Sequence, residues 1–178
     1  MELLANGPVA TIQSSAKGKF ERATAVIDIQ ATPAEVWRTA TDFASYRYFL
    51  PKVVKSDVLS ATPTQVQVKL EVDVPISNAK YTFRYDLDPA AFKLHGEWMK
   101  GDLKGTFCDW RIVPYKDRTL LYYTTSIRGL SGLATTFEDD QQTITVGVNV
   151  VTALAVVKAV KRRVEMTASA TPAPAPTP

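Results

Sequence analysis

Residues 32–51 read TPAEVWRTATDFASYRYFLP, and this stretch decides the fold because it specifies two short helices in a chain that is otherwise rich in strands. Thr32 is a favourable helix N-cap, Pro33 occupies the first helical position, and Glu35 completes a capping box. Aromatic residues crowd the second half, and Pro51 ends it because proline cannot continue a helical hydrogen-bond ladder. The stretch therefore predicts a helix pair.

Alternating apolar and polar side chains follow the helix pair, and this period of two is typical of strands with one buried face. Residues 65–74 read QVQVKLEVDV, residues 80–88 repeat the alternation with aromatic side chains, and further alternating runs reach residue 128. A β-branched run at residues 23–30 predicts one more strand, which precedes the helix pair.

The last apolar segment, residues 144–160, ends in a basic triplet at residues 161–163. Its length and its terminal cations favour a helix, although its many valines leave a strand as the competing interpretation. It is too short and too polar for a comfortable membrane span. We therefore expect an α+β fold in which a curved antiparallel sheet of about seven strands wraps around a long C-terminal helix, with two short helices after the first strand.

The chain divides into three predicted parts. Residues 1–22 form a lead-in with one short strand near residues 9–13, residues 23–167 form the folded domain, and residues 168–178 form a Pro/Ala/Thr tail. We expect this tail to be disordered because it cannot bury apolar surface.

The composition of the chain argues against several classes of binding function. The net charge is +3, and no basic stripe is interleaved with aromatic residues, so we expect no nucleic-acid partner. One histidine and one cysteine offer no metal-ligand spacing, and no phosphate-binding glycine loop follows a strand, so we expect neither metal nor cofactor. The N-terminus lacks a signal-peptide pattern, which predicts a cytoplasmic protein as the sequence stands, or a periplasmic one if an export signal was removed.

Three segments resemble one known superfamily. They are TPAEVWRTATDFASYRYFLPKV at residues 32–53, GTFCDWRIVPYKDRTLLYY at residues 105–123, and the terminal helix. Over residues 23–166 the chain resembles the START-related (SRPBCC, Bet v 1-like) superfamily with its helix-grip fold, in particular the polyketide cyclase/dehydratase and coenzyme Q-binding group. The resemblance implies the fold rather than one activity, because members of this fold bind different ligands. The segment LLANGPVAT also resembles the residues that follow export signals in some bacterial relatives.

The phase of the alternation separates inward from outward side chains. His95 shares its face with Lys93 and Glu97, which predicts a surface histidine rather than a general base. Cys108 faces inward without an accompanying base, which predicts a small buried hydrophobe rather than a nucleophile.

The inward face is aromatic and aliphatic, which predicts either a plain core or the lining of an apolar cavity. We expect a cavity because one helix rarely fills a wrapped sheet of this size, with the helix pair closing one end. The expected lining residues are Val66, Val68, Leu70, Tyr81, Phe83, Tyr85, Trp98, Trp110, Tyr122 and Val151. The alternation does not separate Tyr122 from Tyr123.

The leading hypothesis is non-enzymatic binding or transport of an apolar small molecule, such as a lipid, an isoprenoid quinone or a polyketide-like compound. It depends on an inward face that lacks a convergent acid–base pair. The alternative is a polyketide cyclase/dehydratase that uses Tyr85 or Thr106, and a second alternative is a filled domain that works by protein contact. Transient membrane contact is compatible with the first hypothesis, and the sequence does not indicate an oligomeric state.

Overall fold

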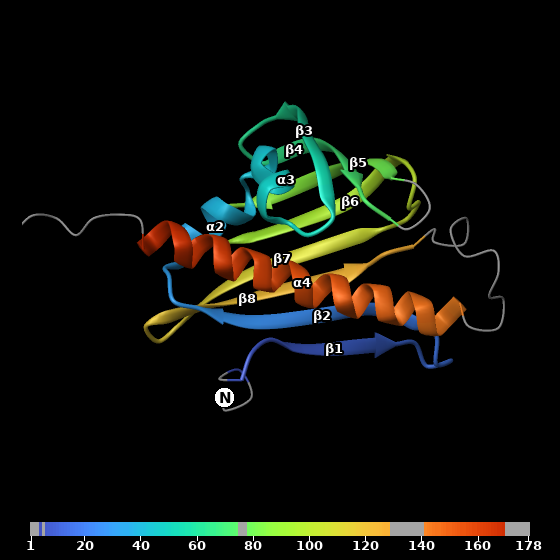
Figure 1. The fold of residues 1–178 in the computed structure, drawn as a ribbon, viewed down its shortest axis with the longest axis horizontal. Helices are drawn as coiled ribbons and strands as arrows, with labels where there is room; N and C mark the ends of the chain where they lie inside the picture. Colours follow the sequence, from blue (N-terminus) through green and yellow to red (C-terminus); the bar gives the residue numbers. More distant parts are fainter. Residues whose placement is uncertain (1–3, 5, 75–77, 129–140, 170–178) are drawn as a thin grey trace, which may run out of the picture.

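An antiparallel sheet of eight strands and one long helix dominate the structure (Figure 1). The computed structural model describes residues 4, 6–74, 78–128 and 141–169. Its strands are β1 (Val9–Ser14), β2 (Phe20–Ile29), β3 (Val53–Ala61), β4 (Gln65–Val72), β5 (Ala79–Asp88), β6 (Lys93–Gly101), β7 (Phe107–Tyr115) and β8 (Arg118–Ser126). Their order is β1-β2-β8-β7-β6-β5-β4-β3, so β1 and β3 form the two edges.

Burial follows the alternation of the sequence along the strands. On β4, Val66, Val68 and Leu70 are buried, while Lys69 between them is exposed. β4 and β5 pair in continuous register, so the inner side chains of both strands face the same side of the sheet. The α+β helix-grip fold predicted from the sequence is confirmed, with β1 as an eighth strand in place of the expected seven.

β1 lies where the sequence predicts a short strand, and it pairs with the outer edge of β2. The division of the chain into lead-in, domain and tail stays a prediction. Of the proposed tail, residues 170–178 lie outside the described residues.

The helix pair consists of α2 (Pro33–Ala40) and α3 (Tyr46–Phe49), which are joined through the short 3₁₀ helix η1 (Phe43–Ser45). The capping box forms as predicted: the Thr32 hydroxyl accepts from the Glu35 N–H at 3.3 Å, and the Glu35 carboxylate accepts from the Thr32 N–H at 2.8 Å. The buried Tyr46 hydroxyl donates to the Ala40 carbonyl at 2.5 Å, which joins α3 to the end of α2. The pair therefore forms one unit at one end of the sheet (Figure 1).

Helix α4 (Gln141–Ser169) extends beyond the predicted segment at both ends. It packs chiefly on β2, with further contacts to β8, α2 and β1 (Figure 1). By length and composition its residues 142–167 could cross a bilayer, a criterion that the core helices of soluble proteins also meet. Three acidic residues at positions 138–140 precede the predicted segment, and they lie outside the described residues.

Candidate ligand-binding site

Side chains with polar tips converge on the inner face of the sheet, below the helix pair. We call them the inner polar cluster: Tyr46, Tyr85, Cys108, Trp110 and Tyr123, each less than 9% exposed. The rings of Trp110 and Tyr123 meet edge to face at 4.8 Å, and Trp110 and Tyr46 stack at 6.5 Å. These contacts join β7, β8 and α3 in a single aromatic layer.

Gly96 on β6 leaves room for the ring of Tyr85 to lie across this strand. It pairs with Tyr85 on one side and with Cys108 on the other. A Cβ atom at position 96 would lie 2.5 Å from Tyr85 Cε1 and 2.9 Å from Cys108 Sγ. Only a residue without a side chain lets the phenol ring lie across this strand and approach the thiol.

Burial moves the ionisation of the cluster further above neutral pH. It raises the pKa of Tyr46, Tyr85 and Tyr123 well above the ordinary value of a phenol. Burial also raises the pKa of the Cys108 thiol to about 12. The phenols and the thiol therefore remain protonated and act as neutral hydrogen-bond donors.

Two donors in the cluster have no strong acceptor within the described residues. Trp110 Nε1 is buried without a hydrogen-bond partner. The Tyr85 hydroxyl likewise donates to no described residue, whereas the Tyr46 hydroxyl is satisfied by Ala40. Within the described residues, neither group is therefore committed to a strong acceptor.

The sequence profile that matches this chain is that of the polyketide cyclase/dehydrase and lipid transport family, over residues 29–167. The chain belongs to this family. A comparison with curated protein sequences finds no relative.

Solved structures share the fold of this family member. The ZhuI aromatase/cyclase from Streptomyces sp. R1128 has a TM-score of 0.70 and 19% identity over 84% of this chain and 96% of that one. A START superfamily protein from Mycobacterium smegmatis has a TM-score of 0.68 and 18% identity over 82% and 98%. A STAR-related lipid transfer protein fragment from Xanthomonas axonopodis has a TM-score of 0.62 and 14% identity over 88% and 98%. At these identities the likeness concerns the fold alone.

Most residues predicted to line the cavity lie on the inner face of this family member. Six of them are buried: Val66, Val68, Leu70, Phe83, Tyr85 and Trp110. Tyr81 and Trp98 are partly buried against the same core. The indole N–H of Trp98 is already engaged, because it donates to the carbonyls of Gly101 at 3.2 Å and Asp102 at 2.9 Å.

Two predicted lining residues are wrong. Tyr122 lies on the outer face, where the Arg111 guanidinium stacks 4.6 Å from its ring, and Tyr123 takes the inner position. Both faces of β8 are apolar, so the alternation could not fix its phase. Val151 is 65% exposed on the side of α4 that faces away from the sheet, because this helix is apolar all round and its period does not identify the packed side.

The candidate catalytic Thr106 lies outside the inner polar cluster. Its hydroxyl accepts from the Arg128 N–H at 2.9 Å and donates to the Arg128 carbonyl at 3.4 Å. The Thr106 hydroxyl therefore stabilises the backbone at Arg128, just after β8, and is not available to a ligand.

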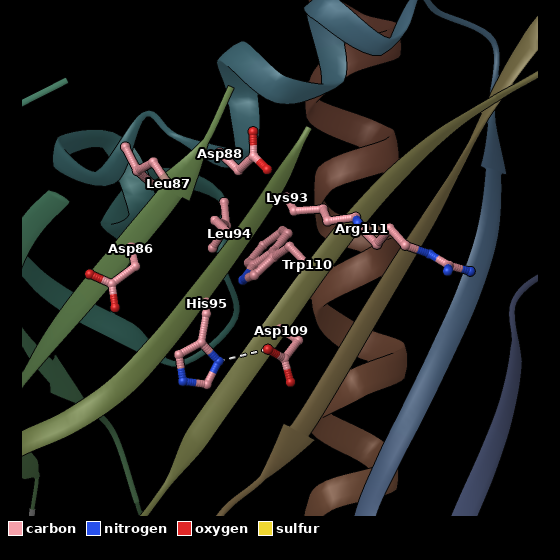
Figure 2. A pocket seen from close by; sticks show the side chains of 9 residues that line it. All are labelled: Asp86, Leu87, Asp88, Lys93, Leu94, His95, Asp109, Trp110 and Arg111. Carbon is pink, nitrogen blue, oxygen red and sulfur yellow. Dashed lines mark hydrogen bonds and ion pairs between the residues drawn. The ribbon is translucent and has the colours of Figure 1, made fainter. Parts of the chain in front are cut away.

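A hollow of about 410 Å³ lies across β5, β6 and β7 on the face away from α4 (Figure 2). It is lined by Asp86, Leu87, Asp88, Lys93, Leu94, His95, Asp109, Trp110 and Arg111. His95 Nδ1 lies 2.7 Å from Asp109 Oδ1, and both side chains are 44% exposed, so His95 is a surface residue as its strand phase predicts. In the described part of the chain no group of three or more His, Cys, Asp or Glu side chains could hold a metal ion.

The sequence did not identify Tyr46 and Gly96 as parts of the site, and it left Tyr123 as an alternative to Tyr122. The available signal for Gly96 was a glycine inside an otherwise alternating strand, which often marks a close approach by another group. Tyr46 gave no signal, since its place depends on how the helix pair docks onto the sheet.

Proposed function

We propose that this family member binds an apolar small molecule between the inner face of the sheet and its helices, without catalysing a reaction. The observation that supports this most is the character of the inner polar cluster, which is aromatic, neutral and buried. Burial of apolar ligand area contributes about 25 cal/mol per Å², and the free donors orient the ligand.

Among the described residues, no poised acid–base pair lies on the inner face of the sheet, which favours binding over chemistry. General acid–base catalysis needs a pKa near the working pH, and burial moves the pKa of Tyr85 and Cys108 away from that range. His95 and its partner Asp109 lie on the opposite face of the sheet.

Native mass spectrometry of the purified protein, followed by organic extraction, tests the proposal. We expect co-purified or added apolar ligand, for example a lipid, an isoprenoid quinone or a polyketide-like compound. Leu70→Trp fills space on the inner face and should lower ligand occupancy, while Leu59→Trp on the exposed side of β3 serves as the matched control. A wild-type protein that takes up none of these ligands and no hydrophobic dye contradicts the proposal and supports a filled core.

A second candidate is turnover of an aromatic or polyketide-like substrate, favoured by the buried, protonated phenol of Tyr85. Tyr85→Phe should then abolish turnover while substrate binding persists. Activity that survives this substitution, or no activity on a panel of such substrates, argues against it.

Ligand exchange with a membrane is a further part of the proposal. Val151 and Met166 are each 65% exposed on α4, and such apolar side chains fit a transient contact with lipid. Sedimentation with vesicles, compared between the wild type and Val151→Asp, tests this step.

A further inference from the structure

The indole N–H of Trp110 is the least satisfied group in the described core. Trp110 is 3% exposed, and its Nε1 has no hydrogen-bond partner. Buried donors are nearly always paired because an unmet hydrogen bond costs the whole desolvation penalty of the group. A native fold that keeps such a donor calls for an explanation.

The surrounding side chains do not supply a good acceptor. A hydrogen bond from Trp110 to the Cys108 sulfur lowers the pKa of the thiol against the larger effect of burial, but the sulfur of the protonated thiol is a weak acceptor and leaves the indole N–H without a geometrically well-formed hydrogen bond. The rings of Tyr46 and Tyr123 contact the indole. The Tyr46 hydroxyl is committed to the Ala40 carbonyl, which holds its ring in place.

The lack of charged side chains in the described core restricts which ligand groups could accept a hydrogen bond from Trp110 Nε1. The buried polar side chains of the described chain are all neutral: Ser56, Thr82, Thr106, Thr119, Thr125, Ser126 and Asn149. A carboxylate or phosphate brought into these surroundings would lose its hydration without gaining a cation. A carbonyl oxygen carries no such penalty and accepts from both an indole N–H and a phenol.

We propose that Trp110 Nε1 anchors a neutral carbonyl oxygen of the ligand, with the Tyr85 hydroxyl as a second donor. The ligand class is then an apolar ketone, aldehyde or quinone rather than a fatty acid or a phospholipid. This inference rests on the proposed binding function and specifies its ligand.

Three probes with one carbon skeleton test it: 9-fluorenone, fluorene and fluorene-9-carboxylate. Fluorenone differs from fluorene by a carbonyl in place of a methylene group, so the pair isolates the acceptor. We expect fluorenone to bind about five-fold more tightly than fluorene, as one added neutral hydrogen bond implies. The carboxylate should bind more weakly than either.

Trp110→Phe should remove the preference for fluorenone over fluorene, while the control Tyr122→Phe on the outer face should keep it. Because the first variant alters the core, the wild type supplies a second readout. Its three tryptophans give three indole N–H signals in NMR spectra. Fluorenone should shift the Trp110 signal downfield and fluorene should not, with Trp37 and Trp98 as internal references.

The outcomes separate the two proposals. Equal binding of fluorenone and fluorene, with no selective shift of the Trp110 signal, overturns the carbonyl anchor and leaves apolar binding intact. Tightest binding of the carboxylate also overturns it. Failure of all three probes, together with failure of lipids and quinones, overturns the binding function and this inference with it.

Discussion

At the scale of single residues, buried polar side chains do structural work that no apolar residue could replace. Asn149 is fully buried on α4, and its side chain accepts from the Ile127 N–H at 2.6 Å. The same amide donates to the carbonyls of Ile127 at 3.3 Å and Thr145 at 2.8 Å. One side chain thus satisfies the backbone beyond β8 and fixes the position of α4.

Asn149→Ala should therefore lower the free energy of unfolding by about 2–3 kcal/mol, because it leaves the buried Ile127 N–H unpaired. Thr143→Ala, at an exposed position on the same helix, is the control and should change stability little. Urea denaturation of both variants measures the difference. Equal stability of the two would show that water replaces the amide at no cost.

Gly96→Ala tests the close approach of Tyr85. The added methyl group would overlap the ring at 2.5 Å, so Tyr85 must move, and we expect a loss of about 1–3 kcal/mol of stability together with weaker ligand binding. Gly147→Ala is the matched control, since nothing lies within 4 Å of its Cβ position, and it should stabilise the exposed helix by up to about 1 kcal/mol. Thermal denaturation and dye binding measure both effects. A Gly96→Ala protein as stable as the wild type would refute the steric argument.

At the scale of elements, the capping box sets where α2 begins. Thr32→Ala should cost about 1 kcal/mol of stability, while the exposed loop variant Thr64→Ala should cost little.

The backbone N–H of Thr32 is the largest cause of a lowered pKa of Glu35, followed by the Thr32 hydroxyl. A carboxyl group whose pKa is lower in the folded state stabilises the fold at pH values above its unfolded pKa. This stabilisation is lost as pH falls through the folded pKa. Thr32→Ala keeps the backbone N–H and removes only the hydroxyl that donates to the Glu35 carboxylate, so the part of its cost that comes from this hydroxyl should shrink in acid. A cost that is independent of pH in urea denaturation would contradict this account.

Elements with a strong local signal could be predicted, and elements that depend on distant partners could not. The capping box and the alternation of β4 and β5 identify their own structure, since each needs only neighbouring residues. The ends of α4 and the phase of β8 could not be fixed because both are apolar on all sides. Whether the indole N–H of Trp110 finds a hydrogen-bond partner depends on strand pairing and on how the helices dock onto the sheet. Neighbouring residues in the sequence do not determine either.

At the scale of the whole molecule, the two faces of the sheet differ in charge. The outer face carries the ion pair of Arg118 with Asp28 at 2.5 Å and the hydrogen-bonding contact of His95 with Asp109 at 2.7 Å. The inner face carries phenols, a thiol and an indole, and no described buried side chain is charged. Such exposed pairs contribute little stability, so the fold depends mainly on its neutral interior.

This neutral interior should make the protein sensitive to alkali. Burial raises the pKa of the Cys108 thiol to about 12 and raises the pKa of Tyr46, Tyr85 and Tyr123 well above the usual value. As pH increases, the unfolded chain loses these protons first, so the unfolded state gains stability relative to the folded one. Between its unfolded and folded pKa values each group should lower the free energy of unfolding by about 1.4 kcal/mol per pH unit.

Urea denaturation from about pH 8 to about pH 11 should show this decline, which begins near the ordinary pKa values of thiols and phenols. Cys108→Ala should flatten it, whereas Leu59→Ala, at a position 51% exposed, should leave its slope unchanged. Phenolate absorbance gives an independent view of the same groups. The buried Tyr46, Tyr85 and Tyr123 should ionise only as the protein unfolds. If all of them titrate together while the fold persists, solvent reaches the inner polar cluster freely and its buried, neutral character is refuted.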